Sequence, residues 1–174
     1  MKSLFIAVLT VLLSVASVNA SAQEPIVIVQ RFVQMDVEGK RLSPDGWREA
    51  DQLFTHHSTP PQEKRIIVIA KHYKVSESTL PANAGYYLGY WQIGRLDSSL
   101  CLHPFASKVE TRFLDKFAVH KAREGWKIDG SQPIEAHLTP KAAIRYLTDM
   151  TDKSTDASVK SNASKSIAIL KRYE

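Results

Sequence analysis

Two segments near the start of the chain carry apolar residues at helical spacing. The first begins at Pro25 and repeats an apolar residue every third or fourth position, with Gly39 placed as its C-terminal cap. The second follows Ser43, where a serine N-cap and a proline at the first helical position are typical of a helix start. These patterns predict two successive amphipathic helices and a proline-containing linker at 56–61.

The middle of the chain changes to the alternation that is typical of β-strands. Residues 65–75 are rich in β-branched side chains, and residues 84–102 carry large side chains on both faces of an extended segment. A strand with two apolar faces lies inside a sheet, so we expect 84–102 to be the central strand. Gly89 and Gly94 within it indicate a bulge, a bend or a close approach of another backbone, so we expect a bent sheet. Residues 110–122 and 126–128 follow as strands, and the short connections predict an antiparallel sheet.

Helical spacing returns near the C-terminus. Thr139 and Pro140 mark a helix start, and apolar residues repeat at helical spacing to about Lys153. A last helix follows, and its apolar stripe has to be buried against the sheet or a partner chain. The predicted fold class is α+β: N-terminal helices packed on a bent antiparallel sheet, followed by two C-terminal helices at about 139–174.

The first 22 residues resemble a secretory signal peptide in layout. Lys2 precedes a short apolar run that ends in small residues, Ala20-Ser21-Ala22. The run is short for a membrane anchor, which needs about 20 apolar residues. We therefore expect cleavage near residue 22, a secreted or periplasmic location, no membrane association of the mature chain, and a single domain formed by residues 23–174.

Charge, cysteine content and motifs argue against several classes of protein. The formal net charge is +5, but basic and acidic residues alternate, so nucleic-acid binding is not indicated. Cys101 is the single cysteine, which leaves no internal disulfide; we expect a buried thiol or, alternatively, intermolecular oxidation. The sequence contains no HExxH motif, cysteine pair, glycine-rich phosphate loop or nucleophile elbow, so we expect no metal and no cofactor.

Three short stretches, taken with the order of elements, resemble those of a known superfamily. They are residues 32–39 in the first helix, Gly46-Trp47 in the second, and the Gly-Trp-Lys-Ile stretch at 125–128. With the element order, they resemble the nuclear-transport-factor-2-like superfamily, the SnoaL-like or cystatin-like α+β rolls, over about residues 25–129. The resemblance implies a sheet curled around helices to leave a cone-shaped cavity, which members use for catalysis on small apolar molecules, for binding, or for dimer formation.

Acid–base side chains that could face such a cavity are the catalytic candidates. Asp36 interrupts an apolar helix face, and burial would raise the pKa of a carboxyl group toward the range useful for a base. Alternatively, Asp36 begins the polar end of that helix. The other candidates could equally be structural histidines or ion-paired carboxylates. The set comprises Asp36, His72 and Asp97, with Asp115 and His120 as further acid–base positions.

Large aromatic side chains are the ligand-binding candidates, because their faces can stack on an apolar ligand. Such residues are alternatively core or interface residues. The set comprises the aromatic residues Tyr73, Tyr86, Tyr90 and Trp91, together with Arg95.

Three functions stay open on the sequence. The first is binding of a small apolar molecule. The second is cofactor-free lyase or isomerase chemistry that uses Asp with His or Tyr in the cavity. The third is a protein-interaction module that forms, for example, a homodimer. A cavity with an inward carboxylate near a histidine favours the second, a cavity lined by aromatics alone favours the first, and a fully packed interior favours the third.

Overall fold

The structure is a computed structural model that describes residues 24–61, 66–78, 85–105 and 112–174. The predicted signal peptide lies outside these residues. Among the helices that are described, none has both the length and the apolar character needed to cross a membrane.

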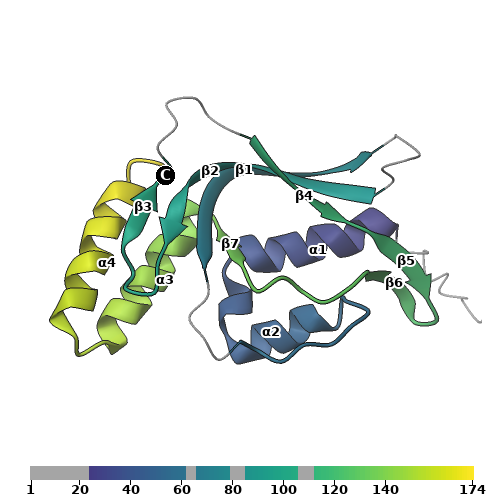
Figure 1. Ribbon diagram of the computed structural model, residues 1–174, viewed down its shortest axis with the longest axis horizontal. Helices are drawn as coiled ribbons and strands as arrows, with labels where there is room; N and C mark the ends of the chain where they lie inside the picture. Colours follow the sequence, from purple (N-terminus) through teal and green to yellow (C-terminus); the bar gives the residue numbers. More distant parts are fainter. Residues whose placement is uncertain (1–23, 62–65, 79–84, 106–111) are drawn as a thin grey trace, which may run out of the picture.

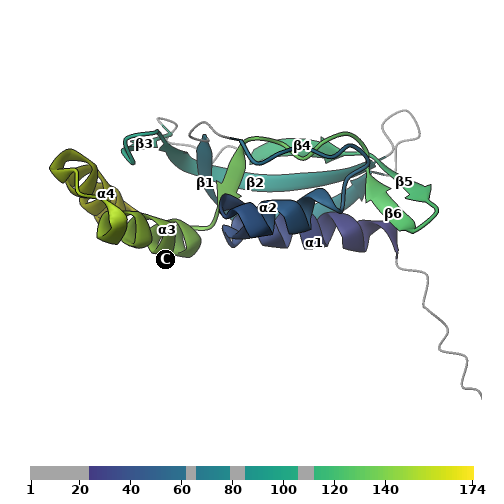
Figure 2. The ribbon, with the colours of Figure 1, turned by 90° about the horizontal axis from the view of Figure 1, so that it is seen from below.

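Both predicted N-terminal helices are present. Helix α1 spans Pro25–Val37, a 3-10 turn spans Lys40–Leu42, and α2 spans Pro44–Asp51. Gly39 has a φ of 80°, the left-handed conformation in which glycine ends a helix, and the Ser43 side chain accepts a backbone N–H at the start of α2. Figures 1 and 2 show the two helices side by side against one face of the sheet.

The main sheet has five strands, and β2 (Gly85–Leu96) is interior to it as predicted. It pairs with β1 (Ile67–Ser78) on one side and with β3 (Leu102–Pro104) and β4 (Arg112–Phe117) on the other, always antiparallel. The fifth strand, β7 (Ala136–Leu138), pairs in parallel with β1. The α+β class is confirmed, but the sheet is mixed. Connection lengths predict the pairing of sequence neighbours only, whereas the crossover from β1 to β7 contains all the intervening strands.

The sheet curls, and β1 carries the main irregularity. Its pairing register with β2 shifts between Ile69 and Ala70 and again between Lys71 and Lys74, where His72 has a φ of 55°. Gly94 is required for a different reason, because a Cβ there would lie 2.5 Å from the carbonyl oxygen of His103 on β3. The predicted close approach of another backbone at Gly94 is confirmed.

The segment predicted as one strand at 110–122 is two strands. After β4, strand β5 (Val119–Ala122) leaves the main sheet and pairs with β6 (Gly125–Ile128) in a separate hairpin. The alternation of side chains continues through both strands, so the sequence pattern does not register the change of partner.

Two hydrophobic clusters explain why β1 opens with apolar residues on both faces. Val68 and Ala70 pack toward α1 and α2, whereas Ile67 and Ile69 belong to the cluster formed with the C-terminal helices. These helices are α3 (Pro140–Lys153) and α4 (Ala157–Leu170), both at their predicted positions. The apolar stripe of α4 is buried within the chain, against α3 and β3.

Two side chains are more exposed than predicted. Trp126 and Ile128 stand two positions apart on β6, a spacing that predicts one shared buried face, but Ile128 is buried and Trp126 is only partly buried, because the β5–β6 hairpin leaves the main sheet. Cys101 is also partly exposed, since it follows a turn at the open end of β2.

Candidate functional site

A pocket of about 460 Å³ opens between α1, the β4 edge of the sheet and the segment that leads into β7. One part of its wall is apolar, and there the ring of Phe32 packs edge-on against Phe54 and Phe117, with centroids 4.9 and 5.6 Å apart. The other part is polar and consists of Asp36, Asp115, Lys116, Asp129, Ser131, Glu135 and His137. The interior therefore combines apolar surface with convergent ionisable groups, as ligand sites do.

Asp36 and His137 form a buried pair at the back of this pocket. Asp36 is only 2% exposed, although it stands one residue before the end of α1. One carboxylate oxygen, Oδ2, lies 3.0 Å from Nδ1 of His137 and also accepts the backbone N–H of His137 at 3.2 Å. The reading of Asp36 as the polar end of the helix is wrong, because the β7 backbone closes over it.

The second oxygen of Asp36 is held by Arg41, which is fully buried. The Arg41 guanidinium also donates to the Gln132 side chain at 3.1 Å and lies over the rings of Phe32 and Trp47. The chain of contacts continues from Gln132 to Asp51 and from Asp51 to His57 at the surface. This buried network fixes the Asp36 carboxylate, and with it the ring of His137.

The second ring nitrogen of His137 points into the pocket. Within the part of the chain that the structure describes, Nε2 is a buried side-chain atom with no hydrogen-bond partner. It lies 3.5 Å from Oδ2 of Asp115 and 3.7 Å from Oε1 of Glu135, whose side chains are 40% and 34% exposed. A buried polar atom without a partner is costly in a native fold and marks a position where a ligand atom can bind.

The pKa values of the two groups that face each other are both shifted upward. Burial opposes the charged form of His137, but the hydrogen bond and charge of Asp36, with the charges of Asp115 and Glu135, outweigh it and raise the pKa. The pKa of Asp115 is raised mainly by burial and further by the charge of Asp36, against the opposing effects of His137 and Tyr90. The charge of each group stabilises the charged form of the other, so Asp115 and His137 are suited to act as an acid–base pair.

Tyr73 and Tyr90, two of the ligand-binding candidates, lie behind His137. Their rings are 5.8 Å apart, and the Tyr90 ring is 4.9 Å from that of His137. The Tyr90 hydroxyl hydrogen-bonds to Asp115, and the Tyr73 hydroxyl donates to the backbone oxygen of Leu138 at 3.1 Å. Burial raises the pKa of both phenols, so both stay neutral near neutral pH. Tyr90 orients Asp115, and Tyr73 fixes the β7 backbone next to His137.

We expect the stability of the protein to fall as the pH rises above about 6.5, the ordinary pKa of histidine. Because folding raises the pKa of His137, its stabilising contribution is complete below that value and is lost as the pH rises through the folded-state pKa. Urea unfolding across this range, compared with the same series for His137→Gln, measures this contribution. Equal pH dependence in the two proteins would contradict the assignment.

The remaining candidates are not part of this cluster. Tyr86 is a buried core residue, Arg95 is exposed, and Trp91 is half-buried against His72, with ring centroids 5.4 Å apart. Asp97 lies just beyond β2, where hydrogen bonds, first of all from His103, lower its pKa. His120 pairs with Asp129 on the surface. Of the candidates, Asp36 and Asp115 line the pocket, and Tyr73 and Tyr90 pack against the ring of His137. The other candidates lie elsewhere.

The sequence argument missed His137 and Arg41. His137 stands between Ala136 and Leu138, just before the helix start at Thr139, and a single histidine in a short apolar stretch forms no motif. Arg41 is one of many basic residues, and its burial depends on side chains that are more than 90 residues away. A local pattern signals neither residue.

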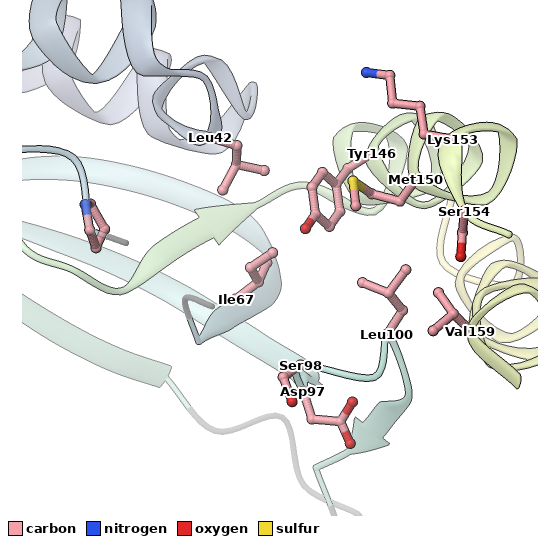
Figure 3. Close-up of a pocket in the computed structure, with 11 residues that line it drawn as sticks. Leu42, Ile67, Asp97, Ser98, Leu100, Tyr146, Met150, Lys153, Ser154 and Val159 are labelled. Carbon is pink, nitrogen blue, oxygen red and sulfur yellow. The ribbon is translucent and has the colours of Figure 1, made fainter. Parts of the chain in front are cut away.

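A second pocket, of about 420 Å³, lies between the C-terminal helices and the end of the main sheet. Figure 3 shows Tyr146 and Met150 of α3 directed toward Ile67 and Leu100. Its ionisable side chains are bound by neighbours, since Lys153 pairs with Asp149 at 2.7 Å and Asp97 pairs with His103 at 2.7 Å. The first pocket is therefore the better candidate site, because there the ionisable groups His137 and Asp115 face each other.

Comparison with known proteins gives no assignment: no protein-family model, no curated protein and no solved structure matches this chain.

Proposed function

We propose that the Asp36–His137–Asp115 pocket binds a small, mainly apolar molecule that carries a carbonyl oxygen, and moves a proton on it as a cofactor-free isomerase or lyase. The observation that carries the proposal is the buried Nε2 of His137, which has no hydrogen-bond partner among the described residues and faces the pocket 3.5 Å from Oδ2 of Asp115. The curled sheet over α1 is compatible with the cone of the nuclear-transport-factor-2-like superfamily, and we propose membership of it on that basis.

The two groups have complementary roles. Asp115, with its raised pKa and the Tyr90 hydrogen bond, takes a proton from the carbon next to the carbonyl group. Protonated His137, held by Asp36, donates from Nε2 to the carbonyl oxygen as negative charge develops there. Because Nε2 of His137 and Oδ2 of Asp115 are 3.5 Å apart, both can contact neighbouring atoms of one bound molecule.

The apolar wall supports the same chemistry. Phe32, Phe54 and Phe117 exclude water from one side of the pocket, which strengthens hydrogen bonds and charge interactions inside it. Arg41 and Asp36 lie behind His137 and fix its ring before a ligand binds, so reorganisation during proton transfer is small. Asp36 and Arg41 are positioning residues in this scheme, and His137 and Asp115 are the proposed catalytic residues.

The proposal is tested with a panel of small cyclic and aryl ketones and enones in D₂O. NMR measures how fast deuterium enters the carbon next to the carbonyl group. We expect the protein to accelerate this exchange for at least one member of the panel. The His137→Gln and Asp115→Asn variants should lose about 100-fold or more of this acceleration, as expected for removal of a general acid or base. His103→Gln, which alters an exposed histidine–aspartate pair away from this pocket, is the matched control and should keep it.

Binding without catalysis is the second candidate, and the aromatic wall of the pocket favours it. In that case NMR detects binding of a panel member, but no deuterium enters it. Exchange that is equally fast in all four proteins would exclude the acid–base roles of His137 and Asp115.

A further inference from the structure

Asp97, Cys101 and His103 bring three different ligand atoms together at the far end of β2. One carboxylate oxygen, the thiol sulfur and one ring nitrogen all lie within 4.8 Å of one another. The cluster is separate from the Asp36–His137–Asp115 pocket, and Asp97 stands at the edge of the second pocket in Figure 3, next to β3. We expected no metal because the sequence lacks the HExxH motif and a cysteine pair. The spacing Asp-x3-Cys-x-His is neither of these, so that expectation did not take this cluster into account.

The separations suit a small tetrahedral cation. Zinc binds thiolate sulfur at about 2.3 Å and imidazole nitrogen or carboxylate oxygen at about 2.0 to 2.2 Å, which places its ligand atoms roughly 3 to 4 Å apart. The three ligand atoms lie within 4.8 Å of one another, so modest side-chain movements bring them to that arrangement. His103 can make such a movement, since its side chain is 64% exposed.

The turn that carries the cluster is held in place on both sides of Cys101. Oδ1 of Asp97 accepts the backbone N–H groups of Ser99 and Cys101 at 2.8 and 3.0 Å, and Oδ2 faces His103. From α4, the buried Ser166 hydroxyl donates to the backbone oxygen of Leu100 at 2.9 Å and accepts the backbone N–H of Leu102 at 2.8 Å. Supporting hydrogen bonds of this kind orient metal ligands before the ion arrives.

We propose that Asp97, Cys101 and His103 form a binding site for a divalent ion of the zinc class, with water in the fourth position. One sulfur, one nitrogen and one oxygen ligand favour zinc over the harder calcium and magnesium ions, which take oxygen ligands. The α4 helix then has a role beyond covering the sheet, because its Ser166 positions the turn that presents the cysteine.

The experiment titrates the reduced, purified protein with Co²⁺, a spectroscopic substitute for Zn²⁺, in the presence of a phosphine reductant. We expect one equivalent of Co²⁺ to produce a thiolate-to-cobalt charge-transfer band, and Zn²⁺ to displace it. Cys101→Ser should abolish the band. His103→Gln and Asp97→Asn should each weaken Co²⁺ binding by at least about tenfold, since loss of even an outer-shell partner costs that much.

The exposed His120–Asp129 pair is the matched control, because it offers a histidine and a carboxylate at similar exposure. His120→Gln should bind Co²⁺ as the unaltered protein does. The proposal is overturned if the unaltered protein gives no band, or if His103→Gln and Asp97→Asn bind as tightly as it does, since a lone thiol would then account for the binding. Far-ultraviolet circular dichroism of each variant checks that the fold is retained.

Discussion

Replacing Arg41 with alanine is expected to lower the free energy of unfolding by about 3 to 5 kcal/mol, the range for removing one partner of a buried ion pair. Asp36 is 2% exposed and Arg41 is fully buried, so the substitution leaves a carboxylate in the interior with His137 as its remaining charged neighbour. It also removes the group that packs over Phe32 and Trp47 and binds Gln132. Urea unfolding followed by circular dichroism measures the loss.

The exposed Arg31–Glu49 pair is the control for this experiment. Its side chains are 54% and 53% exposed, and Arg31→Ala should change the free energy of unfolding by less than about 1 kcal/mol. The Asp36→Asn, Arg41→Ala double variant should lose less than the two single variants together, because each single substitution strands the other charge. Strictly additive losses would show that the two side chains do not stabilise each other.

Trp47→Ala should lower the free energy of unfolding by about 3 to 5 kcal/mol, more than Trp126→Ala does. Trp47 is 1% exposed, and its indole N–H donates to the backbone oxygen of Ser58 at 3.0 Å. Its ring also lies under Arg41, so the buried polar network loses a wall as well as apolar contacts.

Trp126→Ala serves as the comparison, because Trp126 is only partly buried on the β5–β6 hairpin. We expect it to cost about 1 kcal/mol, the centre of the distribution for single substitutions. Thermal or urea unfolding of both variants under one condition gives the ranking. A loss at Trp126 as large as that at Trp47 would mean that the hairpin is part of the main core.

The two predictions share a physical cause, since α1, the 3-10 turn and α2 enclose a polar network together with their apolar core. That network links the surface residue His57 to the pocket residue His137 through Asp51, Gln132, Arg41 and Asp36. Substitutions within it should therefore alter both stability and the pKa of His137, whereas Arg31→Ala should alter neither.

Local patterns in the sequence determined most of the secondary structure. Helical spacing and capping residues placed all four helices, because Gly39, Ser43, Thr139 and the residues after them satisfy helix ends through contacts within a few positions. The large side chains on both faces of β2 predicted its interior position, because such a strand is stable only where other elements cover both faces. The expectation that Asp36 and Asp115 lie near a cavity came from the resemblance to the α+β rolls, not from a local pattern.

Tertiary structure alone decided the parallel β1–β7 pairing and the partners of the buried charges. β7 is three residues long, too short to show a period, and it pairs with β1 although strands β2 to β6 stand between them in the sequence. His137 reaches Asp36 across 101 positions and Arg41 reaches Gln132 across 91. A local pattern records whether a side chain is apolar or ionisable, but the desolvation and charge that shift its pKa come from residues that only the folded chain brings within a few ångströms.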